Sequence, residues 1–204
     1  TFKSELQITD LSPTSIDDSS PYVVLWGLNM IGATTKTFQA VTIEATANMN
    51  NILEPVFLKN GVAIFKDNGT TDGTFDASDQ RMDIGGMPTW ALSATTGRYA
   101  VTLSLSSPQI IPTADSSADL GADYFVTIRT GATTVPGDSI ILNIPVSGVQ
   151  FSDGASLETD TSNILRILPK LRMTDSTVLG GDTISPNDTK AIFGLDMIDS
   201  DHAL

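Results

Sequence analysis

Apolar and polar residues alternate with a period of two through most of the chain, and this pattern constrains the fold more than any other feature. It is clearest in residues 38–47, 99–106, 124–129 and 140–144. Successive side chains of a β-strand point to opposite faces of a sheet, so these segments are predicted strands with one buried face. Residues 22–30 are apolar on both faces, which predicts a central strand.

The predicted strands are short, turn-forming residues separate them, and helical periodicity is almost absent. This combination predicts an all-β fold: an antiparallel, immunoglobulin-like or jelly-roll-like β-sandwich with a C-terminal β-strand extension. We expect the sandwich to occupy residues 1–154 and a polar linker to occupy residues 155–163. Residues 164–204 would then be the opening strands of a second copy, or an extension that exchanges strands.

The expectation of a second copy comes from two short internal matches. Residues 6–10 (LQITD) resemble residues 171–175 (LRMTD), and residues 26–31 (WGLNMI) resemble residues 193–198 (FGLDMI). The matches occur in the same order at offsets of 165 and 167 residues, so a second copy is predicted to start near residue 165. A lone strand pair cannot bury its apolar face. The segment therefore belongs to further copies, adds to a sheet of another subunit, or folds back on its own domain.

Composition narrows the range of partners. The 204 residues carry 11 basic and 24 acidic side chains, a formal net charge of −13. Phosphates would be repelled, which argues against nucleic acid or an anionic membrane as a partner and favours cation binding. No apolar run approaches about 20 residues, so no membrane insertion is expected. The absence of Cys fits secretion as well as the cytosol. No signal peptide is visible, and the two ends suggest a processed or excised product.

Residues 67–79 (DNGTTDGTFDASD) concentrate more ligand chemistry than any other stretch, with four Asp, one Asn and two Gly. Calcium prefers six to eight oxygen ligands, often carboxylates spaced two apart around a glycine turn. The calcium-loop pattern D-x-[DN]-x-[DN]-G-x5-E can be placed here with Gly73 at the turn. The ligand positions then fall on Asn68, Thr70, Asp72, the backbone carbonyl of Thr74, Asp76 and Asp79. Asp67 becomes a ligand instead if residues 69–71 bulge outward.

An acidic hairpin loop without metal is the alternative, with Asp and Gly present for turn geometry and with Lys66 and Arg81 offsetting part of the charge. Four carboxylates this close repel one another unless a cation lies among them, which favours Ca²⁺. The loop also resembles the calcium loops of large, repetitive microbial surface proteins. These are similar to dockerin and thrombospondin type 3 loops, but lie between strands. The resemblance implies an extracellular or cell-surface, calcium-stabilised module with a structural or adhesive role.

Catalysis finds little support in the sequence. The single His202 lies next to the C-terminus and no Cys is present, which argues against a His-based triad or a zinc cluster. A carboxylate pair for glycoside hydrolysis remains open, although Glu is scarce. Trp26 and Trp90 are the candidate platforms for binding a sugar. Trp26 is expected in the core, whereas Trp90 lies in a loop and is either exposed or buried.

The sequence therefore predicts a non-enzymatic structural module of an extracellular repetitive surface or filament-forming protein, stabilised by Ca²⁺ in the 67–79 loop. Self-association, or contact with neighbouring repeats, would occur by β-strand addition. One alternative is a fibre subunit that polymerises by donating residues 170–198 to a neighbour. Another is a carbohydrate-binding adhesin module that holds glycans on Trp90.

Overall fold

The chain folds into strands and turns, as the alternation predicts. The computed structural model describes residues 6–17, 22–31, 36–47, 61–68, 71, 73–86, 88–94, 96–111, 123–128, 139–168, 171–175 and 193–197. These residues contain no helix, which confirms the predicted all-β fold. None of them therefore forms a helix long and apolar enough to cross a membrane. The strands are β1 (Leu6–Asp10), β2 (Ser15–Asp17), β3 (Val23–Met30), β4 (Thr37–Ala47), β5 (Ala63–Lys66), β6 (Gln80–Arg81), β7 (Ala91–Leu92), β8 (Tyr99–Ile110), β9 (Tyr124–Ile128), β10 (Ser139–Ile144), β11 (Val149–Phe151), β12 (Gly154–Ala155), β13 (Asp160–Thr161), β14 (Leu165–Leu168), β15 (Leu171–Asp175) and β16 (Phe193–Met197).

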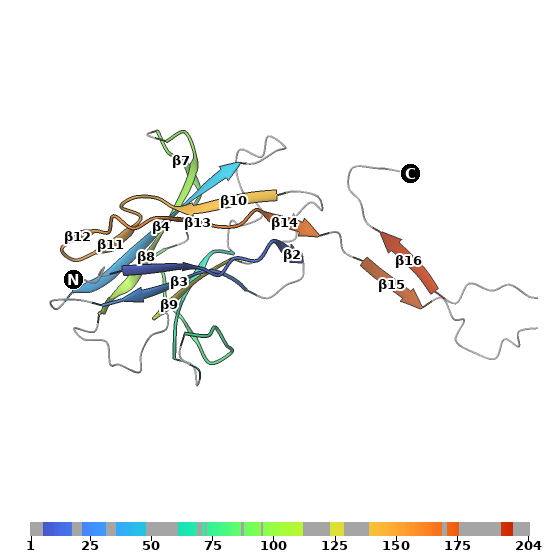
Figure 1. Ribbon diagram of the computed structural model, residues 1–204, viewed down its shortest axis with the longest axis horizontal. Helices are drawn as coiled ribbons and strands as arrows, with labels where there is room; N and C mark the ends of the chain where they lie inside the picture. The colour runs from blue at the N-terminus through green and yellow to red at the C-terminus, as the bar shows by residue number, and fades with distance from the viewer. Residues whose placement is uncertain are drawn as a thin grey trace, which may run out of the picture.

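Two sheets pack against each other to form the sandwich (Figure 1). Sheet A has the strand order β1-β3-β9-β5-β6, and every pairing in it is antiparallel. Sheet B is built around β4, which pairs with β8 along one edge and with β10 and then β11 along the other. Strands β7, β12, β13, β14 and β2 extend sheet B outward, and β2 runs parallel to β14.

Sheet B continues beyond the domain boundary expected at residue 154. Strand β12 pairs with β11, β13 pairs with β10, and β14 pairs with both β10 and β2. Asn163 also contacts the connection between β1 and β2, because its backbone N–H donates to Ser12 Oγ and its side-chain amide donates to the Ser12 carbonyl, both at 2.7 Å. Residues 155–163, expected to be a linker, thus contribute strands to the sandwich, which extends to Leu168.

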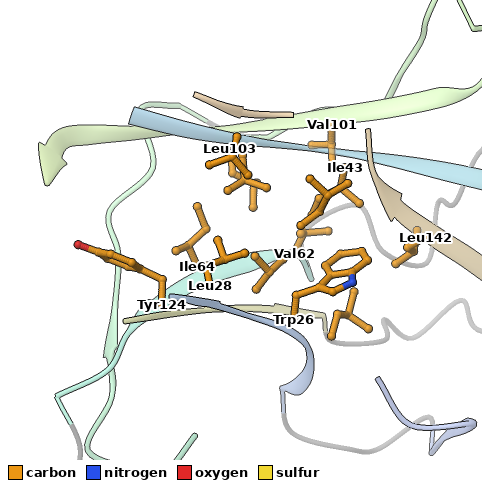
Figure 2. Packing of buried hydrophobic residues seen from close by; sticks show 14 of the residues in the cluster. Trp26, Leu28, Ile43, Val62, Ile64, Val101, Leu103, Tyr124 and Leu142 are labelled. Atoms are coloured by element: carbon orange, nitrogen blue, oxygen red, sulfur yellow. The ribbon is translucent and has the colours of Figure 1, made fainter. Parts of the chain in front are cut away.

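The apolar core lies between the two sheets (Figure 2). Trp26, Leu28 and Ile64 point from sheet A toward Ile43 and Leu103 of sheet B, and all five side chains are fully buried. Strand β3 lies between β1 and β9, and Leu25 to Leu28 are buried, which confirms the expectation that residues 22–30 form a central strand with Trp26 in the core. Burial of apolar surface at roughly 25 cal/mol per Å² is the main force holding such sheets together.

Strands β15 and β16 form a separate two-stranded sheet, drawn in orange and red in Figure 1. Their pairing repeats the pairing of β1 with β3 position by position. The β1–β3 partners are Leu6↔Met30, Gln7↔Asn29, Ile8↔Leu28, Thr9↔Gly27 and Asp10↔Trp26. The β15–β16 partners are Leu171↔Met197, Arg172↔Asp196, Met173↔Leu195, Thr174↔Gly194 and Asp175↔Phe193. The two segments that match in sequence therefore also pair in the same register.

Candidate metal site

The acidic loop of residues 67–79 connects two neighbouring strands of sheet A. Strand β5 pairs with β6 through Phe65↔Arg81 and Lys66↔Gln80, so the loop closes a hairpin. The backbone N–H of Asp67 donates to the Asp123 carbonyl at 2.9 Å, which ties the start of the loop to the segment before β9. The loop therefore lies between two strands, as the sequence predicts, and sheet A fixes both of its ends.

Gly73 occupies the turn of the loop. Its φ of 73° lies in the left-handed region that glycine adopts without steric cost. The Gly73 N–H donates to Asp67 Oδ2 at 2.6 Å, so the first carboxylate of the loop reaches across to the turn. This places the Asp67 carboxylate against the turn of the loop. The candidate ligands Thr70 and Asp72 lie outside the described residues.

Asp79 closes the loop from the other end and is only 9 % exposed. Its Oδ1 accepts the backbone N–H of Asn68 at 3.2 Å, and its Oδ2 accepts the backbone N–H of Asp76 at 2.8 Å. One carboxylate thus joins the beginning and the end of the loop. A buried carboxylate needs such donors, because an unpaired buried charge is strongly destabilising.

The remaining candidate ligands lie nearer the solvent. Asp76 Oδ1 accepts hydrogen bonds from the backbone N–H of Ser78, at 2.7 Å, and from the Ser78 hydroxyl. Asn68 donates its side-chain amide to Gln80 Oε1 at 3.2 Å, which turns its nitrogen toward the neighbouring strand. Thr74 is exposed, and its backbone N–H donates to the Thr71 carbonyl at 3.1 Å.

The spacing and the hydrogen bonds of these carboxylates determine whether the loop can bind Ca²⁺. Among the described residues, no three Asp, Glu, His or Cys side chains lie close enough together to hold a metal ion. The carboxylates of Asp67, Asp76 and Asp79 instead accept N–H and O–H donors of the loop itself. Each carboxylate oxygen can accept more than one partner, so these groups keep acceptor capacity for a cation. Asp67, Asp76 and Asp79 thus lie on one hairpin loop, and Asp72 lies outside the described residues.

Phe75 anchors the loop to the sheet, a feature that the sequence analysis missed. Its ring packs edge-on against Phe65 at 5.1 Å and against Phe125 at 5.6 Å between ring centroids. Aromatic pairs in this geometry contribute about 0.5–1.5 kcal/mol beyond their buried area. The sequence signal was an aromatic residue between two candidate ligand positions in a loop otherwise made of small and polar residues.

The Ser78 hydroxyl and backbone N–H hold the pKa of the Asp76 carboxyl below its usual range, with the side-chain hydrogen bond the larger cause. We expect Ser78→Ala to raise the pKa of Asp76, because the hydroxyl donor is lost while the backbone N–H remains. The measurement is an NMR titration of the Asp76 side chain in both proteins. Hydrogen bonds to the ionised form favour that form. The stabilisation they give is present above the unfolded-state pKa of Asp76, and it is lost as the pH falls through the lower folded-state value. Identical titration midpoints in the two proteins would contradict this assignment.

The two tryptophans do not form a sugar-binding platform. Trp90 is 4 % exposed and belongs to the core, as does Trp26. An indole that binds a sugar by stacking must present one face to solvent, so the carbohydrate-binding alternative based on an exposed Trp90 is wrong. Trp90 lies just before β7, and no local sequence pattern shows that its side chain packs in the core.

No protein-family model matches the chain, and no curated protein matches it in sequence.

Proposed function

We propose that this chain is a non-enzymatic structural module of an extracellular, repetitive surface or filament-forming protein, and that Ca²⁺ in the 67–79 loop stabilises it. The observation that carries the proposal is the repetition of the β1–β3 pair by β15–β16. The residues of β15 and β16 match those of β1 and β3 at offsets of 165 and 167, and each matched pair of residues has the same partner position in both strand pairs. A chance resemblance of short segments would not be expected to reproduce five strand partners in order.

Repetition favours a structural role over a catalytic one. Repeat proteins stack copies of one unit, and their stability adds up from units and their interfaces. The described part of the chain places an apolar core between two sheets, and its acidic side chains lie outside that apolar cluster. The chain's net charge of −13 fits a module that binds cations and remains soluble.

The charge and the position of the loop are the reasons for proposing that it binds Ca²⁺. Asp67 and Asp79 are held at the two ends of the loop by backbone N–H donors, and Asp76 lies between them in sequence. A bound cation would neutralise the repulsion among these carboxylates and hold the β5–β6 hairpin in one conformation. Asp67, Asp72, Asp76, Asp79 and the Thr74 carbonyl would hold it, with Asn68 and Thr70 as further oxygen donors.

We expect about 10 mM Ca²⁺ to raise the melting temperature by about 3–10 °C relative to chelator, assuming the affinity typical of extracellular modules. The measurement is thermal unfolding followed by circular dichroism, with Mg²⁺ as the comparison ion. Asp79→Asn should abolish most of the shift, because it removes a charge from the buried carboxylate that joins the two ends of the loop.

Asp83→Asn is the matched control, since Asp83 is an exposed carboxylate just outside the loop. It changes the net charge by the same amount and should leave the calcium shift intact. Equal melting temperatures in Ca²⁺ and chelator would refute the calcium site. Equal calcium shifts in Asp79→Asn and the unsubstituted chain would show that any bound Ca²⁺ lies elsewhere.

A further inference from the structure

The two equivalent strands β3 and β16 differ in their number of neighbours. Strand β3 lies between β1 and β9 and is hydrogen-bonded along both edges. Among the described strands, β16 is hydrogen-bonded only to β15. The edge of β16 that corresponds to the β9-facing edge of β3 therefore lacks a strand in this part of the chain. An unpaired edge with an apolar sequence is a template for adding another strand.

The strand that fits this edge is one like β9, because β16 repeats the sequence that β9 recognises in β3. In the sandwich, Trp26 lies opposite Val126, Gly27 opposite Phe125 and Leu28 opposite Tyr124. The positions equivalent to Trp26, Gly27 and Leu28 in β16 are Phe193, Gly194 and Leu195. Gly194 thus repeats Gly27, the small residue opposite Phe125, and it is flanked like Gly27 by one large apolar residue on each side.

In an intact sandwich, both edges of β9 are already paired with other strands. Strand β9 pairs with β3 along one edge and with β5 along the other. All five of its residues are buried, with Tyr124 the most exposed at 3 %. The β15–β16 hairpin can reach a β9 strand only in a copy whose own β1–β3 position is vacant.

The hairpin cannot take that position in its own sandwich. Only residues 169 and 170 separate the end of β14 from the start of β15, and such a connection spans about 11 Å at most. Leu168 lies level with Asp17, because β14 and β2 are parallel and in register. Figure 1 shows β1, in dark blue, starting at the opposite end of the sandwich from the end of β14. Bringing β15 onto the place of β1 would require β14 to leave sheet B.

We infer that β15–β16 is the completing hairpin of a second copy of this domain, and that β16 pairs there with the β9-equivalent strand in the register of β3. The partner is a sandwich formed from strands equivalent to β4–β14, not an intact copy. This inference rests on the repeat part of the proposed function and is independent of calcium. Consecutive copies would then be joined by the two residues between β14 and β15.

The test is to join the full 204-residue chain at Leu204 to a second copy of residues 36–168. In this fusion, the residues that follow β16 take the place of the loop between β3 and β4. The added copy contains β4 to β14 and lacks β1, β2 and β3. Hydrogen exchange, followed by mass spectrometry or NMR, is read at Gly194 and Leu195. We expect their amides to exchange at least about 100-fold more slowly than in the 204-residue chain, as core strands do.

A complete second copy, residues 1–168, joined at the same point is the matched control. In this complete copy, its own β3 pairs with the edge of β9 that β16 would otherwise take. The amides of β16 should therefore exchange as fast as they do in the 204-residue chain. Within the incomplete fusion, Leu195→Asp should abolish the protection, because the equivalent Leu28 is fully buried. Asp196→Asn should preserve it, since Asn29 occupies the equivalent position.

Unchanged exchange at Gly194 and Leu195 in the incomplete fusion would overturn the inference. Protection of these amides by the complete copy would overturn it as well, because β16 would then be pairing with something other than a vacant β9 edge. The exchange measurements are made both in chelator and in Ca²⁺. Loss of the calcium-induced melting shift would therefore reject the proposed metal site without changing the conclusion about β16. Likewise, absence of β16 protection would reject the inference about β16 without changing the conclusion about calcium.

Discussion

Replacement of Trp26 by Ala is expected to lower the melting temperature of the sandwich by roughly 6–20 °C. Trp26 is fully buried in β3, with β1 on one side and β9 on the other. Truncating a buried Trp costs about 3–5 kcal/mol, because the apolar contacts are lost and a cavity remains. A domain of this size loses about 2–4 °C per kcal/mol. Thermal unfolding and urea titration of the two proteins measure the difference.

Leu92→Ala is the control for this substitution. Leu92 also lies in a strand, β7, but it is 60 % exposed. Its truncation should change the free energy of unfolding by no more than about 0.5 kcal/mol, as is usual for surface positions. A Trp26→Ala protein that melts within a few degrees of the Leu92→Ala protein would show that the core is not organised around β3.

The second large effect is expected at Gly148, in the tight connection between β10 and β11. A Cβ added there would lie 2.7 Å from the Pro145 carbonyl oxygen and 2.9 Å from Ile144 Cγ2. The backbone cannot easily shift, because the Gly148 N–H donates to that same oxygen and the Gly148 carbonyl accepts the N–H of Thr42. Overpacking of this kind costs about 1–3 kcal/mol. We expect Gly148→Ala to lower the urea midpoint accordingly.

Gly85→Ala is the matched control for Gly148→Ala. The nearest atom to a Cβ at Gly85 would be the Ser104 carbonyl oxygen at 3.7 Å, an ordinary van der Waals contact. Both substitutions remove the same backbone freedom from the unfolded chain, so their difference isolates the clash in the folded state. Equal urea midpoints would mean that the connection between β10 and β11 relaxes around the new methyl group.

The strands with strong alternation were predictable because burial on one face leaves a direct trace in the sequence. Residues 38–47 and 140–144 correspond closely to β4 and β10, and the run 22–30, apolar on both faces, corresponds to β3. The same argument explains what was missed. Strands β12 and β13 have two residues each, too few to show a period, so residues 155–163 were interpreted as a linker. Their place in sheet B depends on partners that are distant in sequence.

The acidic loop shows the same division between local and long-range information. Gly73 at the turn and the hairpin position of the loop follow from the residue types and from the flanking strands. The link from Asp79 to Asn68 and the packing of Phe75 on Phe125 depend on how the loop folds back on sheet A. Trp90 likewise became buried through the path of its loop, which no local pattern encodes. The internal match was visible in the sequence, whereas its shared register needed the structure.

The parallel pairing of β2 with β14 has a mechanical consequence. Strand β14 is the last strand of the sandwich, and it lies between β10 and β2 in sheet B. In the proposed array of modules, tension passed from one module to the next would enter the sandwich along the axis of β14. Hydrogen bonds between strands run across that axis, so the load would shear the bonds on both sides of β14 together rather than open them singly. We expect this strand to act as the clamp that resists extension of the chain.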